Sequence, residues 1–180
     1  MFRLRVGFQR LCSAGAMLAL CLMVAVPAFA ANDDEATATS EERQAMNSIA
    51  EVAMQTAMKA IQESGGLYPF AMIAKADGDA KVLGYQGTQE TAPPPDQWTA
   101  ALFMRLQQMA EEEPDLKVLV LVRLHEVTSK QGEKVPGIWA QVDHRDAEPW
   151  VLFLPFLRNE AGRHEVGELI YYASEQPIFP

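Results

Sequence analysis

The chain has 180 residues and a formal net charge of −9, and 49% of its residues are hydrophobic, a composition that suits a globular domain with a buried core. Its excess of acidic residues argues against binding to nucleic acid or to an anionic membrane surface, since both carry negative charge. Both cysteines, Cys12 and Cys21, lie in the first thirty residues, so the rest of the chain offers no disulfide and no thiol for catalysis.

Residues 1–30 have the pattern of a cleavable signal peptide. Three arginines form a basic start, residues 14–26 carry no charge, and Ala28-Phe29-Ala30 supplies the small-x-small pattern that signal peptidases recognise. The uncharged run is shorter than the roughly 20 apolar residues that a spanning helix needs. We therefore expect a mature protein that begins near Ala31, is periplasmic or secreted by a bacterium, and has no stable membrane insertion. Removing three arginines and no acidic residue takes the net charge from −9 to −12.

The segment after the cleavage site predicts a lead-in and then a helix. Residues 31–40 are small and acidic, which predicts a flexible lead-in to a single domain, residues 41–180. Thr39 and Glu42 form a capping-box pair. Apolar residues then recur at helical spacing: Met46, Ile49, Ala50, Ala53, Ala57, Ala60 and Ile61. Ser64-Gly65-Gly66 is expected to end this helix, because glycine readily adopts the left-handed conformation that follows a helix end.

A hairpin and a second helix follow. Residues 67–74 and 81–85 are strand-like and flank Asp77-Gly78, a dipeptide typical of hairpin turns. Asp96 is expected to cap the second helix, and Pro114 to end it. One face of this helix carries an apolar series: Trp98, Leu102, Leu106 and Met109.

Residues 116–156 form three β-rich runs separated by short turns, which predicts an antiparallel meander. Because strand side chains alternate, Val118, Val120, Val122 and Leu124 share one face of the first strand, and Ile138, Ala140 and Val142 supply the matching core face of the second. The opposite face carries the candidate binding residues Arg123, His125, Trp139, Gln141 and Asp143. The alternative is a half-solvated face on which Arg123 and Asp143 form a weak cross-strand pair.

The last strand is expected over residues 165–173, and the apolar Ile178 and Phe179 should pack against the domain. We therefore predict an α+β domain in the order α-β-β-α-β-β-β-β, with one antiparallel sheet of five or six strands and two helices on one face. This element order is similar to that of profilin-like, roadblock-like and PAS-like folds. A helix followed by Ser64-Gly65-Gly66-Leu67-Tyr68-Pro69-Phe70 and a later meander also resembles small exported bacterial α+β domains, and the resemblance implies no activity.

No residue pattern predicts a catalytic site, a metal site or a cofactor. The parity of the meander places His125 and His144 on opposite faces, so they cannot share a zinc ion. No serine lies in a nucleophile elbow. Glu126, Asp143 and Asp146 are carboxylates that could approach one another across strands, but nothing distinguishes them from ordinary strand-end charges, so an enzyme is the least supported class.

Three functional hypotheses remain, in order of support. The first is an exported, non-catalytic protein that binds another protein, as an inhibitor or immunity factor, or that binds a second copy of itself. A tryptophan beside an arginine is the pairing most often found at interface hot spots. The second is a sensor-like module that holds a small ligand between a helix and the sheet. The third is a hydrolase that depends on carboxylates and His125.

Overall fold

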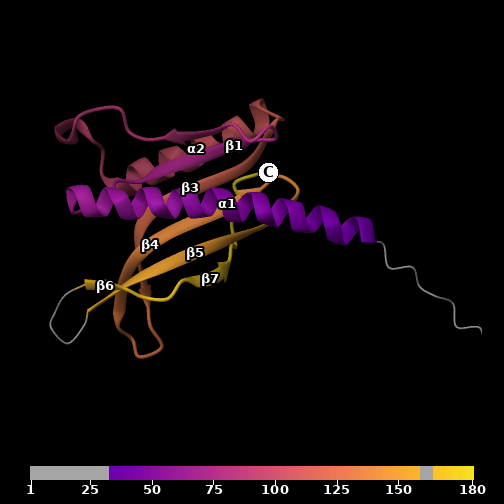
Figure 1. Cartoon of the computed structure of the whole chain (residues 1–180). Helices are drawn as coiled ribbons and strands as arrows, with labels where there is room; N and C mark the ends of the chain where they lie inside the picture. Colours follow the sequence, from indigo (N-terminus) through magenta and orange to yellow (C-terminus); the bar gives the residue numbers. More distant parts are fainter. Residues whose placement is uncertain (1–32, 159–163) are drawn as a thin grey trace, which may run out of the picture. The chain divides into compact units, whose positions relative to one another are not determined.

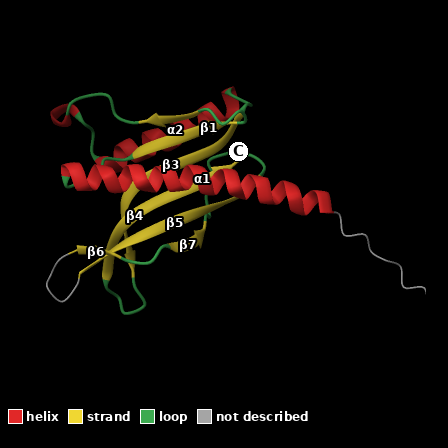
Figure 2. Ribbon diagram, viewed as in Figure 1, coloured by secondary structure: helices red, strands yellow, loops and turns green. Residues whose placement is uncertain are grey.

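The computed structural model describes residues 33–158 and 164–180, so the predicted signal peptide lies outside the described residues. The described chain forms one antiparallel sheet and two α-helices, which confirms the predicted α+β class (Figures 1 and 2). The elements are α1 (Asp33–Ser64), β1 (Phe70–Lys75), β2 (Ala80–Leu83), the 3₁₀ turn η1 (Gln89–Thr91), α2 (Pro95–Glu112), β3 (Leu116–Thr128), β4 (Lys134–His144), β5 (Ala147–Arg158), β6 (His164–Val166) and β7 (Ile170–Ala173).

The sheet has seven strands in the described ranges, where five or six were predicted, and its order is β2-β1-β3-β4-β5-β6 with β7 also paired to β5. The additional strand arises because the predicted strand over residues 165–173 is two strands. β6 pairs Val166 with Phe156, whereas β7 pairs Ile170 with Phe153, so the register shifts by one residue between them. Both strands lie along the same outer edge of β5.

Helix α1 begins at Asp33, within the segment that we expected to be a flexible lead-in. The predicted capping box at Thr39 and Glu42 therefore lies inside the helix rather than at its start. The predicted apolar stripe packs on the sheet, and its fully buried members are Met46, Ala50, Ala53 and Ala57.

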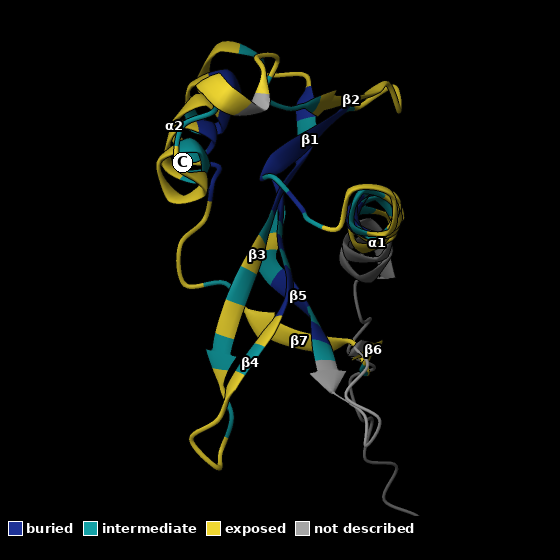
Figure 3. Ribbon diagram, turned by 90° about the vertical axis from the view of Figure 1, so that its left-hand side faces the viewer, coloured by how far each residue is buried: buried dark blue, intermediate teal, exposed yellow. Residues whose placement is uncertain are grey.

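The prediction that both helices share one face of the sheet is wrong, because α1 and α2 cover opposite faces (Figure 3). Helix α1 packs against Val118, Val120 and Val122 of β3, and α2 packs against Leu119 and Leu121 of the same strand. This strand is apolar on both faces, so each face must be covered to remove its side chains from water.

Helix α2 begins one residue earlier than the predicted cap at Asp96. Pro94 occupies the N-cap position without a side-chain hydrogen bond, and Pro95 is the first helical residue. Proline suits this position because its fixed φ is helical and the missing N–H would have no partner there. Asp96 instead lies in the first turn.

The predicted hairpin and the predicted meander register are confirmed. Lys75 N–H donates to Asp79 O at 3.0 Å, and Gly78 closes the turn at a φ of 87°, a conformation that glycine adopts readily. In the meander, Val120 pairs with Val142 and Val122 pairs with Ala140. Along the described part of the chain, no helix has the length and hydropathy required to cross a membrane.

Candidate functional site

The five candidate residues lie on one sheet face, as their parity predicted, but they fall into two groups with different surroundings. Arg123 pairs with Trp139 and His125 with Gly137, while Leu121 pairs with Gln141 and Leu119 with Asp143. The expected cross-strand pair of Arg123 with Asp143 is therefore absent from the described contacts. The two residues are four positions apart along the ladder, about 13 Å.

Gln141 and Asp143 hold the C-terminal segment rather than an open surface. Gln141 Nε2 donates to Gln176 O at 2.6 Å. Asp143 is 1% exposed, and its carboxylate accepts the backbone N–H groups of Ile178 and Phe179. The prediction that this tail packs on the domain is confirmed, since Ile178 and Phe179 are both buried. These two candidate residues thus stabilise the fold.

The other three candidates lie in an aromatic cluster centred on Trp139, on the sheet face opposite α1. The centroid of the Trp139 ring lies 4.8 Å from the centroid of the His125 ring, which it meets edge-on. It lies 5.8 Å from the centroid of the Tyr172 ring, on which it stacks. The guanidinium of Arg123 lies 5.9 Å from the Trp139 ring, within reach of a cation–π contact. The "Trp139 cluster" below denotes these residues together with the buried ring of the cross-strand neighbour of Trp139: Arg123, His125, Trp139, Phe153 and Tyr172.

Gly137 makes room for this cluster. A Cβ atom at Gly137 would lie 2.6 Å from the Phe153 ring and 2.5 Å from Leu154 O, distances at which neighbouring atoms would have to move. The absence of a side chain lets Phe153 lie against β4 next to Trp139. The cluster therefore includes one fully buried ring, Phe153, beside Trp139, while Tyr172 at its edge is 38% exposed.

Sequence reasoning did not find Phe153 and Tyr172. Residues 150–157 are almost continuously apolar, so the alternation that would assign Phe153 to a face is missing. Tyr172 was placed in a strand of incorrect length, and its register on β5 depends on the shift between β6 and β7. The adjacent Tyr171 and Tyr172 were the available signal, because neighbouring strand residues must place one ring on each face.

Burial changes the pKa values of the two basic side chains in this cluster. Burial lowers the pKa of the Arg123 guanidinium, which remains protonated at neutral pH. Burial is also the main cause that lowers the pKa of His125, and the positive charge of Arg123 lowers it further. The result is a neutral imidazole beside a cation and the Trp139 ring, which makes a mixed apolar and polar surface.

We expect His125 to titrate below the ordinary histidine value of about 6.5, and Arg123→Gln to raise its pKa part of the way back, because burial would remain. With the folded pKa below the unfolded one, the contribution of His125 to stability is present above the unfolded value and is lost as pH falls through the folded value. NMR titration of the His125 ring in both proteins measures the pKa. A His125 pKa at or above the ordinary value would contradict this description.

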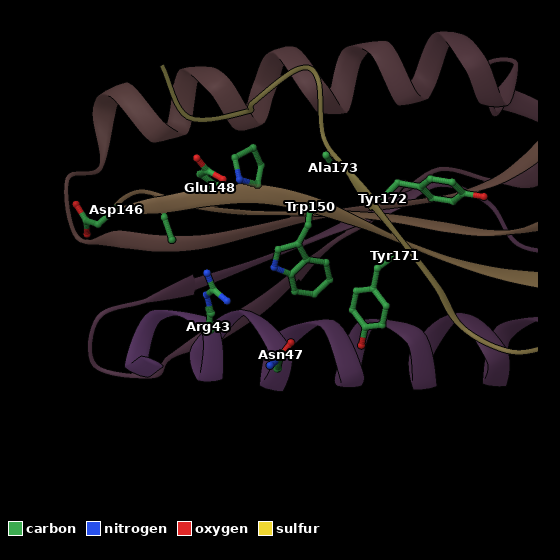
Figure 4. A pocket seen from close by; sticks show the side chains of 10 residues that line it. Arg43, Asn47, Asp146, Glu148, Trp150, Tyr171, Tyr172 and Ala173 are labelled. Atoms are coloured by element: carbon green, nitrogen blue, oxygen red, sulfur yellow. The ribbon is translucent and has the colours of Figure 1, made fainter. Parts of the chain in front are cut away.

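A groove lies on the other side of the sheet, between α1 and the edge formed by β5 and β7 (Figure 4). Its volume is about 1080 Å³. Arg43 and Asn47 reach it from α1, while Trp150 of β5 and Tyr171 of β7 provide aromatic walls with ring centroids 5.8 Å apart. Arg43 makes no ion pair within the described part of the chain, so its charge is available to a ligand.

Glu42, His144 and Asp146 bring three potential metal ligands within 4.8 Å of one another. Their hydrogen bonds fit a His144 ring that is protonated on Nε2 better than they fit a bound metal ion. The backbone N–H of Asp146 donates to His144 Nδ1 at 3.0 Å, so the neutral ring carries its proton on Nε2. A histidine that binds metal through Nε2 needs that proton on Nδ1. The carboxylate of Asp146 also already pairs with Lys117 Nζ at 2.7 Å.

The other chemical expectations are tested by the strand register. His125 and His144 lie on opposite faces, as predicted, since His144 pairs with Val118 on the α1 side. The approach of Glu126 to Asp143 that the sequence left open does not occur, because their places on the ladder differ by seven residues, about 23 Å. The expectations that the chain has no catalytic residue, no metal and no cofactor stay predictions.

Comparisons with known protein families, with curated proteins and with solved structures find no match for this chain. The contacts within the chain are therefore the basis for assigning a function.

Proposed function

We propose that this chain is an exported, non-catalytic binding protein that recognises another protein through the Trp139 cluster. The observation that carries the proposal is the placement of Trp139, held between Arg123, His125 and Tyr172 on the sheet face opposite α1. Tryptophan, tyrosine and arginine are the residues most enriched at interface hot spots. Here they are fixed by strands and by a buried ring, so little side-chain freedom is lost on binding.

The sequence supports the cellular setting of this proposal. A basic start, an uncharged run and an Ala-Phe-Ala site favour export to the periplasm or the medium. The net charge of −9 favours a neutral or basic protein surface over nucleic acid. An inhibitor or an immunity factor would suit a rigid surface of this kind, because such complexes form with little backbone change.

A comparison of Trp139→Ala with Val120→Ala tests the proposal. Val120 is fully buried under α1, so its truncation should lower the free energy of unfolding by about 1–3 kcal/mol. Trp139 is half-buried, and we expect Trp139→Ala to destabilise the isolated protein less. The same change should weaken binding to a co-purified partner by about 2 kcal/mol, roughly 30-fold.

Urea denaturation measures the stability of both variants, and isothermal titration with the co-purified protein measures binding. Val52→Ala, on the exposed side of α1, is the control that should change neither. A Trp139→Ala protein that is less stable than Val120→Ala, or that binds its partner with unchanged affinity, would refute the proposed role of the cluster.

The groove between α1 and β7 supports a second candidate function, the binding of a small ligand. Its unpaired Arg43 guanidinium and its two aromatic walls would suit a flat molecule that carries an anionic group. A ligand of this type should raise the thermal midpoint of the wild-type protein and have a much smaller effect on Arg43→Gln.

A further inference from the structure

Strand β7 is an open edge of the sheet. It pairs with β5 on one side, no strand in the described ranges pairs with its other side, and all four of its residues are exposed. The N–H of Ser174 donates to Pro149 O. This bond determines which residues of β7 direct their backbone groups toward β5, because hydrogen-bonded positions alternate along the pair of strands. In an antiparallel ladder, Ile170 and Tyr172 then bond to β5, and the N–H and C=O groups of Tyr171 and Ala173 point outward.

The opposite edge of the sheet is protected, whereas β7 is not. Strand β2 carries Lys81, which pairs with Asp79 at 3.3 Å, and a charge on an edge strand hinders the approach of another strand. Strand β7 has the sequence Ile-Tyr-Tyr-Ala and carries no charge. An exposed, uncharged edge with free backbone groups is a template for strand addition.

Both faces of β7 border surfaces that could receive side chains. Tyr172 stacks on Trp139 and belongs to the Trp139 cluster. Tyr171 packs on Trp150 in the groove beside α1 (Figure 4). Because side chains alternate along a strand, a segment added to β7 would direct one set toward the Trp139 cluster and the other toward the groove.

The charges at the ends of β7 specify the occupant. Glu168 precedes the strand and Glu175 follows it, both are exposed, and neither forms an ion pair in the described structure. In an antiparallel pair of two β7 strands, Glu168 of each copy would approach Glu175 of the other, and adjacent like charges destabilise such a pair. A segment with Lys or Arg near each end would be attracted instead.

We propose that an extended segment of a partner protein adds to β7 as a further strand, with β-branched or aromatic residues at its centre and basic residues at both ends. This inference rests on the proposed function, because it names the part of the partner that the protein-binding surface receives. Backbone hydrogen bonds to Tyr171 and Ala173 would supply affinity, and the acidic ends would select the partner by charge.

The test compares two alanine-to-proline variants at opposite edges of the sheet. Proline removes a backbone N–H, and the N–H of Ala173 points away from β5. Ala80 is the matched control on β2, since the Lys75–Asp79 hydrogen bond and the pairing of Ala80 with Ala74 direct its N–H away from β1. Neither change removes a hydrogen bond within the sheet, so both variants should keep the wild-type thermal midpoint to within a few degrees.

The probe is a fluorescent peptide of about eight residues with a Val-Tyr-Val-Tyr centre and two lysines at each end, and a second peptide replaces the lysines by glutamate. Fluorescence anisotropy should show saturable binding of the lysine peptide to wild type and to Ala80→Pro. Binding should be at least about tenfold weaker for Ala173→Pro, and the glutamate peptide should bind at least about tenfold more weakly to wild type.

Equal binding of the lysine peptide by the two proline variants would overturn strand addition, as would the absence of saturable binding to wild type. Equal binding of the two peptides would overturn the selection by charge. A wild-type dimer that Ala173→Pro dissociates in sedimentation would identify a second copy as the occupant and contradict the inference. If the natural partner loses affinity for Trp139→Ala and keeps it for Ala173→Pro, the proposed function stands and strand addition fails.

Discussion

We expect Arg145→Ala to lower the free energy of unfolding by about 3 kcal/mol, because hydrogen bonds from a charged group are worth about 1.5–3 kcal/mol each and are not additive. The Arg145 side chain donates to three backbone carbonyls, those of Leu116 at 2.9 Å, Ala110 at 2.7 Å and Glu113 at 3.0 Å. Two of these carbonyls belong to the C-terminal end of α2, where the helix dipole favours a cation. The guanidinium also lies 4.8 Å from the Phe179 ring.

Arg145 thus joins α2, the start of β3 and the C-terminal tail, and the size of its effect follows from these simultaneous contacts. Arg145→Lys should recover only part of the loss, since an ammonium group cannot reach three carbonyls with the geometry of a guanidinium. Arg105→Ala is the matched control on α2, because Arg105 is exposed and its contact with Glu112 is 3.7 Å long. Urea denaturation followed by circular dichroism should show no more than about 0.5 kcal/mol of change for that control. An equal effect of the two alanine variants would contradict this account of Arg145.

We expect Asp143→Ala to destabilise the protein by about 2–4 kcal/mol, because a buried donor left without an acceptor costs about 1–3 kcal/mol. The carboxylate accepts the backbone N–H groups of both Ile178 and Phe179, and alanine would leave both without a partner. The tail would then lose its attachment to β4. Asp143→Asn retains an acceptor oxygen and should destabilise less.

The two Asp143 variants also predict a pH dependence. Burial raises the pKa of Asp143, although the hydrogen bonds from the tail oppose this change. The folded state therefore holds the proton more tightly, and the stabilising contribution is complete below the unfolded pKa of about 3.9 and is lost as pH rises through the folded pKa. Across that interval the wild type should lose stability relative to Asp143→Asn, whose side chain cannot ionise. Denaturation at a series of pH values measures this difference, and a difference that stays constant with pH would be the contrary result.

The meander was predictable because its core faces alternate without interruption. Val118, Val120 and Val122 face Ala140 and Val142 as the parity of the sequence required. The same run also contained the evidence for two covered faces. Residues 116–122 are apolar at nearly every position, which is typical of a strand buried on both sides. The error in the helix arrangement came from treating only one of these faces as core.

The candidate site was only partly predictable, because its neighbours come from distant segments. Parity placed Arg123, His125 and Trp139 on one face, but it could not show that the tail covers Gln141 and Asp143, 35 residues from their partners. Neither could it place Tyr172, whose position depends on the one-residue shift between β6 and β7. Long-range packing of this kind leaves no periodic signal in a sequence.

Photocross-linking from position 172 tests most directly whether the Trp139 cluster contacts another protein. A photoreactive phenylalanine analogue in place of Tyr172 keeps an aromatic ring beside Trp139, and the same analogue at Val52 samples the exposed side of α1. In cells that make the protein, irradiation should give one cross-linked species of defined mass from position 172 and none from position 52, and Trp139→Ala should abolish it. The same cross-linked species from both positions, or a species that persists with Trp139→Ala, would contradict the proposed binding surface.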